Sequence, residues 1–234
     1  MTPDELTDAD LAAYCHPSRP FWLGQGECAC TQSHLKVLRA MLDSGDALAL
    51  VLEDDVALSP RLPAFLRAIE AAPPDFDLLR IETGDTRVRV LSVQPALAGI
   101  EIVRLVGYDS GSGGYLVSRR GASRLLNNVE ARRRPVDQAW FDSQAPLARQ
   151  MIVRQTVPGL CIQSRFEITG VPVLASDLGN GDARPTAEAP WVWRHRLNRF
   201  SRALHRDTVT AFKKQWFQRV EGARLLRIPF LAIP

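Results

Sequence analysis

The segment Val51-Leu52-Glu53-Asp54-Asp55-Val56 places three carboxylates directly after a short apolar run that begins at Ala47. A run of this length and composition is typical of a buried β-strand. Side chains that follow such a strand face the crevice in which open α/β sheets bind ligands. Three neighbouring acids repel one another, and Mg²⁺ or Mn²⁺, which prefer oxygen ligands, are the usual counter-charges. The alternative is a solvated acidic turn, and the triplet alone does not separate the two interpretations.

Predicted strands and helices alternate along the chain, which indicates one α/β domain over residues 1–185. The expected strands are 47–52, 77–81, 88–93, 100–106, 115–117 and 151–157. The expected helices are 32–43, 60–71, 119–129 and 135–140. Thr31 or Ser33 is predicted to cap the first of these helices, and residues 1–30 are predicted to be irregular because proline and glycine interrupt every pattern.

The composition fits one sizeable core and conceals a charge asymmetry. The chain has 234 residues, of which 46% are hydrophobic, and a net charge of +3. Residues 191–234 carry ten basic and two acidic residues, a net charge of +8, so the preceding residues are acidic overall. No signal peptide and no apolar run of transmembrane length is recognised, so a cytoplasmic setting is expected.

Residues 186–234 are expected to form a basic C-terminal tail. Aromatic and aliphatic residues recur there at three- and four-residue spacing between arginines and lysines, which favours an amphipathic helix or helix pair. Such a face suits the surface of an anionic membrane. The apolar face could equally pack on the domain and leave the arginines solvated. Nucleic-acid binding by this tail is a third interpretation. It is disfavoured because no nucleic-acid-binding motif accompanies the positive charge.

Several familiar chemistries find no support in the sequence. No phosphate-binding P-loop and no Gly-x-Ser-x-Gly elbow is present. The Gly111-Ser112-Gly113-Gly114 loop lacks the spacing of a dinucleotide fingerprint, and it is either a turn or a place where backbone approaches a sugar or phosphate. Cys28, Cys30 and His34, with the pair Cys15-His16, could bind zinc, but Cys-x-Cys lacks the usual two-residue spacer.

His34 and Asp137 each have an ordinary structural interpretation when taken alone. A single histidine on a helix is more often a hydrogen-bonding core residue than a catalyst. Asp137 follows Pro135-Val136 at the start of a short helix, where an acid complements the helix dipole.

Four motifs taken in order change this interpretation. The stretch Gly26-Glu27-Cys28-Ala29-Cys30-Thr31-Gln32-Ser33-His34 resembles the Gly-Glu-Ile-Gly-Cys-Ala-Leu-Ser-His block of glycosyltransferase family 25, the lipopolysaccharide and lipooligosaccharide galactosyltransferases. The acidic segment at Glu53 follows it, as in the family. Gly114-Tyr115-Leu116-Val117-Ser118 with Gly121-Ala122 and Leu125, and then Pro135-Val136-Asp137, resemble the family's next two motifs.

The resemblance implies a GT-A-like fold, a Rossmann-type α/β/α sandwich, here with a basic, helical C-terminal tail. It implies transfer of a sugar, in this family often galactose from UDP-galactose, to an oligosaccharide or glycolipid acceptor such as lipopolysaccharide. The enzyme would need Mn²⁺ or Mg²⁺ and would sit in the cytoplasm, peripherally on the inner face of the cytoplasmic membrane.

The resemblance also assigns candidate roles to residues. Asp55 would be the direct metal ligand, Asp54 a second metal-site residue whose side chain points back into the fold, and Glu53 would reach the ribose or a metal-bound water. Asp137 is the first choice for the general base and Glu27 the second, although Asp137 could instead bind metal and Glu27 could orient a loop. Substrate-site residues are the set Ser33, His34, Gly114 and Tyr115. Tyr115 would stack on a sugar face or lie in the core.

One departure from the family motivates a second function. Family members normally begin with an additional strand that opens the nucleotide-binding half of the fold, whereas this sequence begins at Met1-Thr2-Pro3-Asp4. The alternative expectation is therefore a catalytically impaired, truncated member of the family that docks on a membrane or a partner protein.

Overall fold

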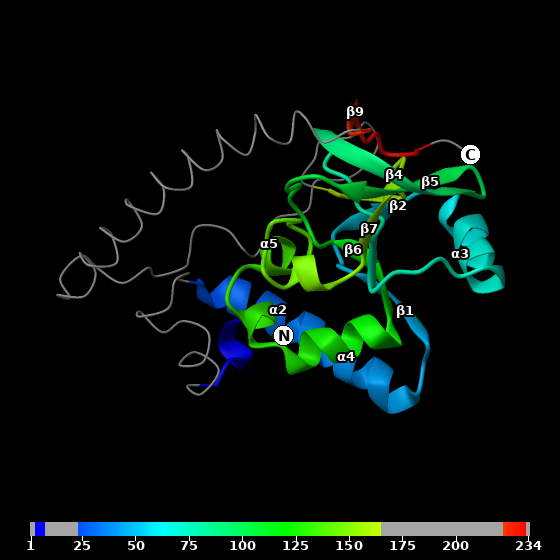
Figure 1. The fold of residues 1–234 in the computed structure, drawn as a ribbon. Helices are drawn as coiled ribbons and strands as arrows, with labels where there is room; N and C mark the ends of the chain where they lie inside the picture. Colours follow the sequence, from blue (N-terminus) through cyan, green and yellow to red (C-terminus); the bar gives the residue numbers. More distant parts are fainter. Residues whose placement is uncertain (1–2, 8–22, 165–221, 233–234) are drawn as a thin grey trace, which may run out of the picture.

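A seven-stranded sheet with the order β1-β6-β3-β7-β5-β4-β9 organises the computed structural model (Figure 1). The structure describes residues 3–7, 23–164 and 222–232. The strands of the sheet are β1 (Leu48–Leu52), β3 (Leu78–Arg80), β4 (Arg87–Leu97), β5 (Ile100–Leu105), β6 (Gly114–Ser118), β7 (Val153–Val157) and β9 (Arg224–Arg227). Strands β2 (Val56–Leu58) and β8 (Cys161–Gln163) form a separate antiparallel pair.

Helices cover both faces of this sheet. The α-helices are α2 (Gln25–Ser44), α3 (Leu62–Ala71), α4 (Arg119–Asn127) and α5 (Val136–Trp140), and the short 3₁₀-helices are η1 (Pro3–Glu5), η2 (Val129–Arg132) and η3 (Ala148–Gln150). Helices α2, α4 and α5 pack on one face, and α3 packs on the other (Figure 1). Alternate strand residues supply the two cores: Tyr115 and Val117 join the first, and Leu116 joins the second. The predicted α/β fold with helices on both faces is confirmed.

The direction of the strands determines which strand ends lie next to one another. Strand β6 is antiparallel to both β1 and β3, and β7 is parallel to β3, so β1, β3 and β7 run the same way. The carboxyl ends of β1 and β3 therefore lie at one edge of the sheet, with the amino end of β6 between them. The residues that follow β1 and β3, beginning at Glu53 and Ile81, share this edge with the Gly111–Gly113 loop.

The predicted start of the first helix is wrong. Helix α2 begins at Gln25, two turns before the expected boundary, and the carboxylate of Glu27 accepts the Gly24 backbone N–H at 2.8 Å. The hydroxyl groups of Thr31 and Ser33 donate to the carbonyl groups four residues earlier, at 2.8 and 2.9 Å. Residues that favour helix caps are thus tolerated inside the helix by back-bonding to its own turns.

The other predicted elements lie near their expected positions, whereas three strands were not predicted. Strands β2 and β8 have only three residues each, too few for a period to appear in the sequence. Strand β9 pairs antiparallel with β4, and Ile228 just after it is buried in a small core with Val88 and Val90. The expected amphipathic helix of the tail lies outside the described residues. None of the described helices is both long and apolar enough to cross a bilayer.

The Asp77 side chain links the starts of strands β3 and β7 to helix α4 through hydrogen bonds. Its side chain is completely buried and accepts hydrogen bonds from Arg120 Nε at 2.6 Å, Arg124 Nη1 at 2.6 Å and the Ile152 N–H at 2.8 Å. Gly121 lets α4 approach this point, because a Cβ there would lie 2.2 Å from the Asp77 carbonyl oxygen. A buried carboxylate with three donors is stable only while all three remain.

Replacing Asp77 with asparagine is expected to lower the free energy of unfolding by about 3 kcal/mol, since it removes a charge that two arginines and a backbone amide require. Urea unfolding monitored by circular dichroism measures this loss. Asp75→Asn is the matched control: Asp75 pairs with Arg120 but its side chain is 65% exposed, so its loss should cost less than about 1 kcal/mol. Equal losses for the two variants would contradict this account.

Candidate active site

The edge formed by β1, β6 and β3 carries the acids that the sequence singled out. The Glu53 backbone N–H donates to the Gly113 carbonyl at 2.8 Å, which extends the pairing of β1 and β6 by one step. On the other side of β6, the completely buried Glu82 accepts the Gly113 N–H with Oε2 at 2.7 Å. The glycine loop is therefore held between two carboxylate-bearing segments.

Close packing explains two of the glycines in this loop. Gly111 has a φ of +109°, and a Cβ there would lie 2.4 Å from Glu82 Oε1. A Cβ at Gly114 would lie 2.2 Å from the sulfur of Cys161. Gly114, expected to contact substrate, is itself buried, so its observed role is to let β6 pass Cys161.

Side chains from three separate segments orient the Glu53 carboxylate. Oε1 accepts from Ser112 Oγ at 2.9 Å and lies 3.2 Å from His34 Nε2, and Oε2 accepts from Gln163 Nε2 at 2.8 Å. The residues come from the glycine loop, helix α2 and strand β8 respectively. Glu53 is thus fixed in one orientation by the packing of all three segments.

His34 connects Glu53 to the core. Its Nδ1 lies 2.9 Å from the Tyr115 hydroxyl, and its ring packs edge-on against Trp140 with centroids 5.7 Å apart. Because Glu53 only accepts, the neutral imidazole places its proton on Nε2, and Nδ1 accepts from Tyr115. Burial raises the pKa of Tyr115 well above its ordinary value, which keeps its hydroxyl available as the donor.

Tyr115 does not offer a face to a sugar. Its side chain has no exposed surface, and its ring packs against Phe141 with centroids 5.5 Å apart. The expectation of a stacking role is therefore wrong, because the inward-facing position on β6 places the ring between the sheet and α5.

Asp55 and Asp54 differ in their surroundings. Asp55 is half-buried, its carbonyl accepts the Ser164 N–H at 2.8 Å, and its Oδ1 lies 3.5 Å from Gln163 Nε2. Burial, followed by the negative charge of Glu53, raises the pKa of the Asp55 carboxyl. Asp54 is exposed, contrary to the expectation that it points back into the fold.

The surroundings of Asp55 fit a hard divalent cation. Mg²⁺ and Mn²⁺ bind through one or two carboxylates together with water and substrate phosphates, and do not need a complete protein cage. Burial and then the charge of Glu53 disfavour the ionised form of Asp55, and a cation bound there would offset both effects. Asp55 is therefore the described residue best suited to hold such an ion, with the exposed Asp54 next to it.

A second group of metal-ligating types lies deeper. Ligand atoms of Cys30, His34 and Glu53 lie within 4.8 Å of one another. Burial, followed by the charge of Glu53, raises the Cys30 pKa to about 12, so its thiol is protonated at neutral pH. Both nitrogens of His34 are already hydrogen-bonded. Cys28, which the zinc alternative included, is buried in the core, and Cys15-His16 lie outside the described residues.

Asp137 reaches the same region from helix α5. Its Oδ2 accepts from the Tyr108 hydroxyl and from the Gly111 N–H, the latter at 3.3 Å, and its Oδ1 accepts the Gln138 N–H at 2.8 Å. Tyr108 is 44% exposed, and burial together with the bond to Asp137 raises its pKa well above the ordinary value. The phenol therefore donates, and Asp137 remains an acceptor beside the glycine loop.

The charges of four predicted acids act on the Cys30 thiol. After burial, the charges that raise the Cys30 pKa are those of Glu53, Asp137, Glu27 and Asp55, in that order. The structure thus brings together acids that are up to 110 positions apart in the sequence. Glu27 uses Oε2 to cap α2, while Ser33 donates to Ala29 within the helix, so both have structural contacts here.

A buried arginine positions the segment between Tyr108 and the glycines. Arg80 has no exposed surface, and its Nη1 donates to both the Asp109 carbonyl and Asp109 Oδ2 at 3.1 Å. Its Nη2 donates to the Ser110 carbonyl. Sequence reasoning missed Arg80, Asp109, Tyr108 and Gln163. An arginine inside an apolar strand was an available signal for Arg80, whereas Gln163 carried none.

The Asp55 pKa is expected to fall in Glu53→Gln, since this change removes the largest charge that opposes ionisation of Asp55 while the burial remains. Carboxyl ¹³C NMR titration without added metal measures the shift. Asp54→Asn is the matched control and should lower the pKa less, because the Asp54 charge has a smaller influence. A larger shift in Asp54→Asn would contradict the arrangement described.

Comparisons with known proteins agree with this geometry. The family model described as glycosyltransferase family 25 (LPS biosynthesis protein) matches residues 5–140, which include Glu27, Glu53, Asp55 and Asp137. The chain is 31% identical over 127 residues to procollagen galactosyltransferase 1-A of Xenopus laevis, covering 53% of this chain and 20% of that protein.

Other relatives give the same picture. Procollagen galactosyltransferase 1 of Danio rerio is 29% identical over 133 residues, and procollagen galactosyltransferase 2 of Homo sapiens is 30% identical over 135 residues. Each match covers 55% of this chain, and 22% and 21% of the respective relative. The chain thus matches about a fifth of the length of these proteins. Since the family model spans more than half of the sequence, the chain belongs to glycosyltransferase family 25.

Proposed function

We propose that this protein transfers galactose from a nucleotide-sugar donor, UDP-galactose, to a lipopolysaccharide or other surface-glycan acceptor, with Mn²⁺ or Mg²⁺ bound at Asp55. Membership of family 25 and the procollagen galactosyltransferase relatives support a galactosyltransferase. The observation that carries the proposal is the convergence of Glu53, Asp55 and Asp137 beside the Gly111–Gly114 loop at one sheet edge.

The acidic segment after β1 is the proposed donor side of the site. Asp55, with Asp54 beside it, would hold the divalent cation and, through it, the donor diphosphate. When bound, this ion acts as a Lewis acid that stabilises negative charge on the departing diphosphate. Glu53 is held by Ser112, His34 and Gln163, so it presents a fixed carboxylate to the ribose or to a metal-bound water.

Asp137 is the proposed general base. It would accept the proton of the acceptor hydroxyl as that oxygen attacks the sugar carbon. Hydrogen bonds from Tyr108 and the Gly111 N–H orient Oδ2 without supplying a full counter-charge. Glu27 is the second candidate, although its bond to the Gly24 N–H gives it a structural role at the start of α2.

The proposed setting is the cytoplasm, with peripheral binding to the inner face of the cytoplasmic membrane. The +8 charge of residues 191–234 and their interleaved aromatic residues support this part of the proposal. Co-sedimentation with vesicles that contain or lack anionic lipid tests it. Loss of binding when residues 191–220 are deleted would support the proposal, and binding without anionic lipid would contradict it.

Isothermal titration with UDP is expected to give binding that requires Mn²⁺ and is weakened at least about tenfold in Asp55→Ala, because the cation loses its principal protein ligand. Asp43→Ala, an exposed aspartate at the far end of α2, is the matched control and should bind UDP like the unmodified protein. Absence of UDP binding with or without Mn²⁺ would instead favour the non-catalytic docking function.

Asp137→Asn is expected to lower kcat for galactose transfer by about 100-fold to 10,000-fold, since the amide preserves the shape but cannot take up a proton. Tyr108→Phe separates this role from orientation, because it removes one donor to Asp137 and leaves the carboxylate in place; its kcat should fall much less. Radiolabelled galactose transfer to lipopolysaccharide oligosaccharide measures both. A similar loss in the two variants would assign Asp137 to loop positioning.

A further inference from the structure

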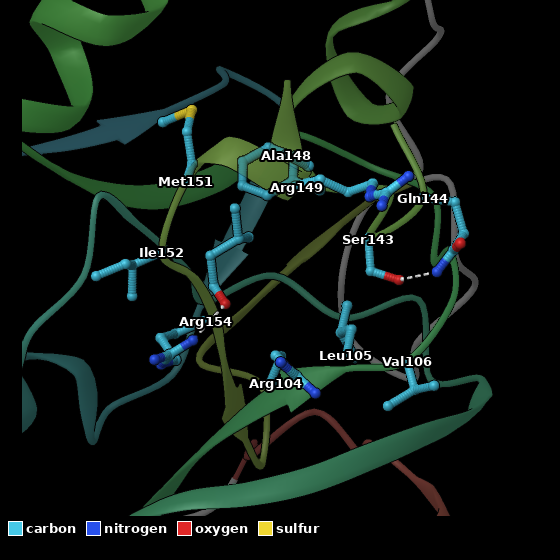
Figure 2. A pocket seen from close by; sticks show the side chains of 12 residues that line it. Arg104, Leu105, Val106, Ser143, Gln144, Ala148, Arg149, Met151, Ile152 and Arg154 are labelled. Atoms are coloured by element: carbon cyan, nitrogen blue, oxygen red, sulfur yellow. Dashed lines mark hydrogen bonds between the residues drawn. The ribbon is translucent and has the colours of Figure 1, made fainter. Parts of the chain in front are cut away.

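A basic pocket of about 460 Å³ lies away from the carboxylates, between the end of β5 and the segment that leads from α5 to β7 (Figure 2). Its walls include Arg104, Leu105, Phe141, Gln144, Arg149 and Arg154. Its volume falls within the range of small-molecule sites.

The charge of this pocket is entirely positive. Three of its lining residues are arginines, Arg104, Arg149 and Arg154, and none is acidic. Adjacent strands β5 and β7 carry Arg104 and Arg154, and their charges are close enough for Arg104 to lower the pKa of Arg154, after the larger effect of burial. Arg154 is partly buried and Arg104 is exposed, so two positive charges lie side by side at the wall of the pocket, where an anion would reduce their repulsion.

Arg154 has few partners of its own. Its Nη1 donates to the Val153 carbonyl at 3.2 Å, and its Nε is buried with no hydrogen-bond partner among the described residues. Asp75 and Asp77 exert only a weaker, opposing influence on its pKa. Asp77 already accepts from two other arginines and a backbone amide. A buried guanidinium N–H without an acceptor is costly unless a ligand supplies one.

The remaining walls fit the carbon body of a small polar molecule. Leu105, Phe141 and Met151 provide apolar surface, and Ser143 and Gln144 provide hydrogen-bonding groups. Ser143 Oγ accepts the Gly107 N–H at 2.7 Å and lies 3.3 Å from Gln144 Nε2 (Figure 2). One wall therefore suits a phosphate and another a hydroxylated ring.

We propose that this pocket binds the phosphate ester of a sugar-sized molecule, at a site separate from the carboxylate edge. The planar guanidinium groups of Arg104 and Arg154 would hold the phosphate oxygens, for which arginine has matching geometry. Arg149 adds charge at the mouth, and Gln144 contacts the sugar hydroxyls. This inference does not depend on the proposed transfer reaction.

Packing contacts and hydrogen bonds connect the pocket to the candidate active site. Phe141 lines the pocket and packs against Tyr115. Ser143 exchanges hydrogen bonds with Gly107, the residue before Tyr108, which in turn donates to Asp137. A ligand in the pocket would therefore contact Ser143, which is hydrogen-bonded to Gly107. Gly107 precedes Tyr108, the residue that donates to Asp137.

Titration calorimetry in metal-free and donor-free buffer tests the proposal, with glucose 6-phosphate, inorganic phosphate and glucose as probes. Glucose 6-phosphate is expected to bind saturably, and at least about tenfold more weakly in Arg104→Gln and in Arg154→Gln, since each loses a charge-assisted hydrogen bond. Arg39→Gln, an exposed arginine on α2, removes the same charge elsewhere and should bind normally. Equal binding of inorganic phosphate would restrict the site to the phosphate group and contradict the sugar-sized ligand.

Absence of saturable binding, or an equal loss in Arg39→Gln, would overturn the proposal. Asp55→Ala separates the two sites: binding that survives in this variant belongs to the arginine pocket, whether or not the protein transfers sugar. Thermal stability gives a second readout. Glucose 6-phosphate should raise the Tm of the unmodified protein but not that of Arg154→Gln.

Discussion

Strand β6 runs between β1 and β3 in the direction opposite to both, and this pairing positions every part of the candidate site. Its ladder of backbone hydrogen bonds aligns Leu52 with Gly114 and Arg80 with Tyr115. The acids that follow β1 and β3 are therefore delivered to the same edge, on either side of the glycine loop. A shift of one residue in either ladder would exchange the inward and outward faces of β6 and move Tyr115 out of the core.

Several carboxylates at one edge of the sheet need hydrogen-bond donors or positive charges, and neighbouring side chains supply them. Glu82 and Asp109 lie beside the buried Arg80, while Glu53 receives three side-chain hydrogen bonds. Among the described residues, Asp55 accepts one side-chain hydrogen bond, from Gln163, and burial followed by the charge of Glu53 raises its pKa. The acids that receive several hydrogen bonds or an arginine stabilise the fold. Asp55 receives fewer and is the acid best placed to bind a cation.

The sequence predicted the elements with strong periodicity and failed where tertiary contacts decide. The strand ending at Leu52 and the helix after Ser118 were predicted because their patterns are local. The start of α2 was not, because Thr31 and Ser33 signal a cap while their hydroxyls bond back within the helix. In the site, the order of the motifs singled out Glu53, Asp55 and Asp137, whose charges all act on the Cys30 thiol. Gln163 and Tyr108 could not be found, since only the pairing of β8 with β2 and the end of β5 bring them to these acids.

The pairing of β9 with β4 has a consequence for how the chain is connected. Arg224–Arg227 form the edge strand of the same sheet that begins at Leu48, and the Gly159 N–H donates to the Pro229 carbonyl at 2.9 Å. Ser164, at the other end of the intervening stretch, is bonded to Asp55. The described residues before and after this stretch therefore belong to one folded unit. Removing the residues after 221 would leave β4 paired with β5 on one side and would expose its other backbone edge.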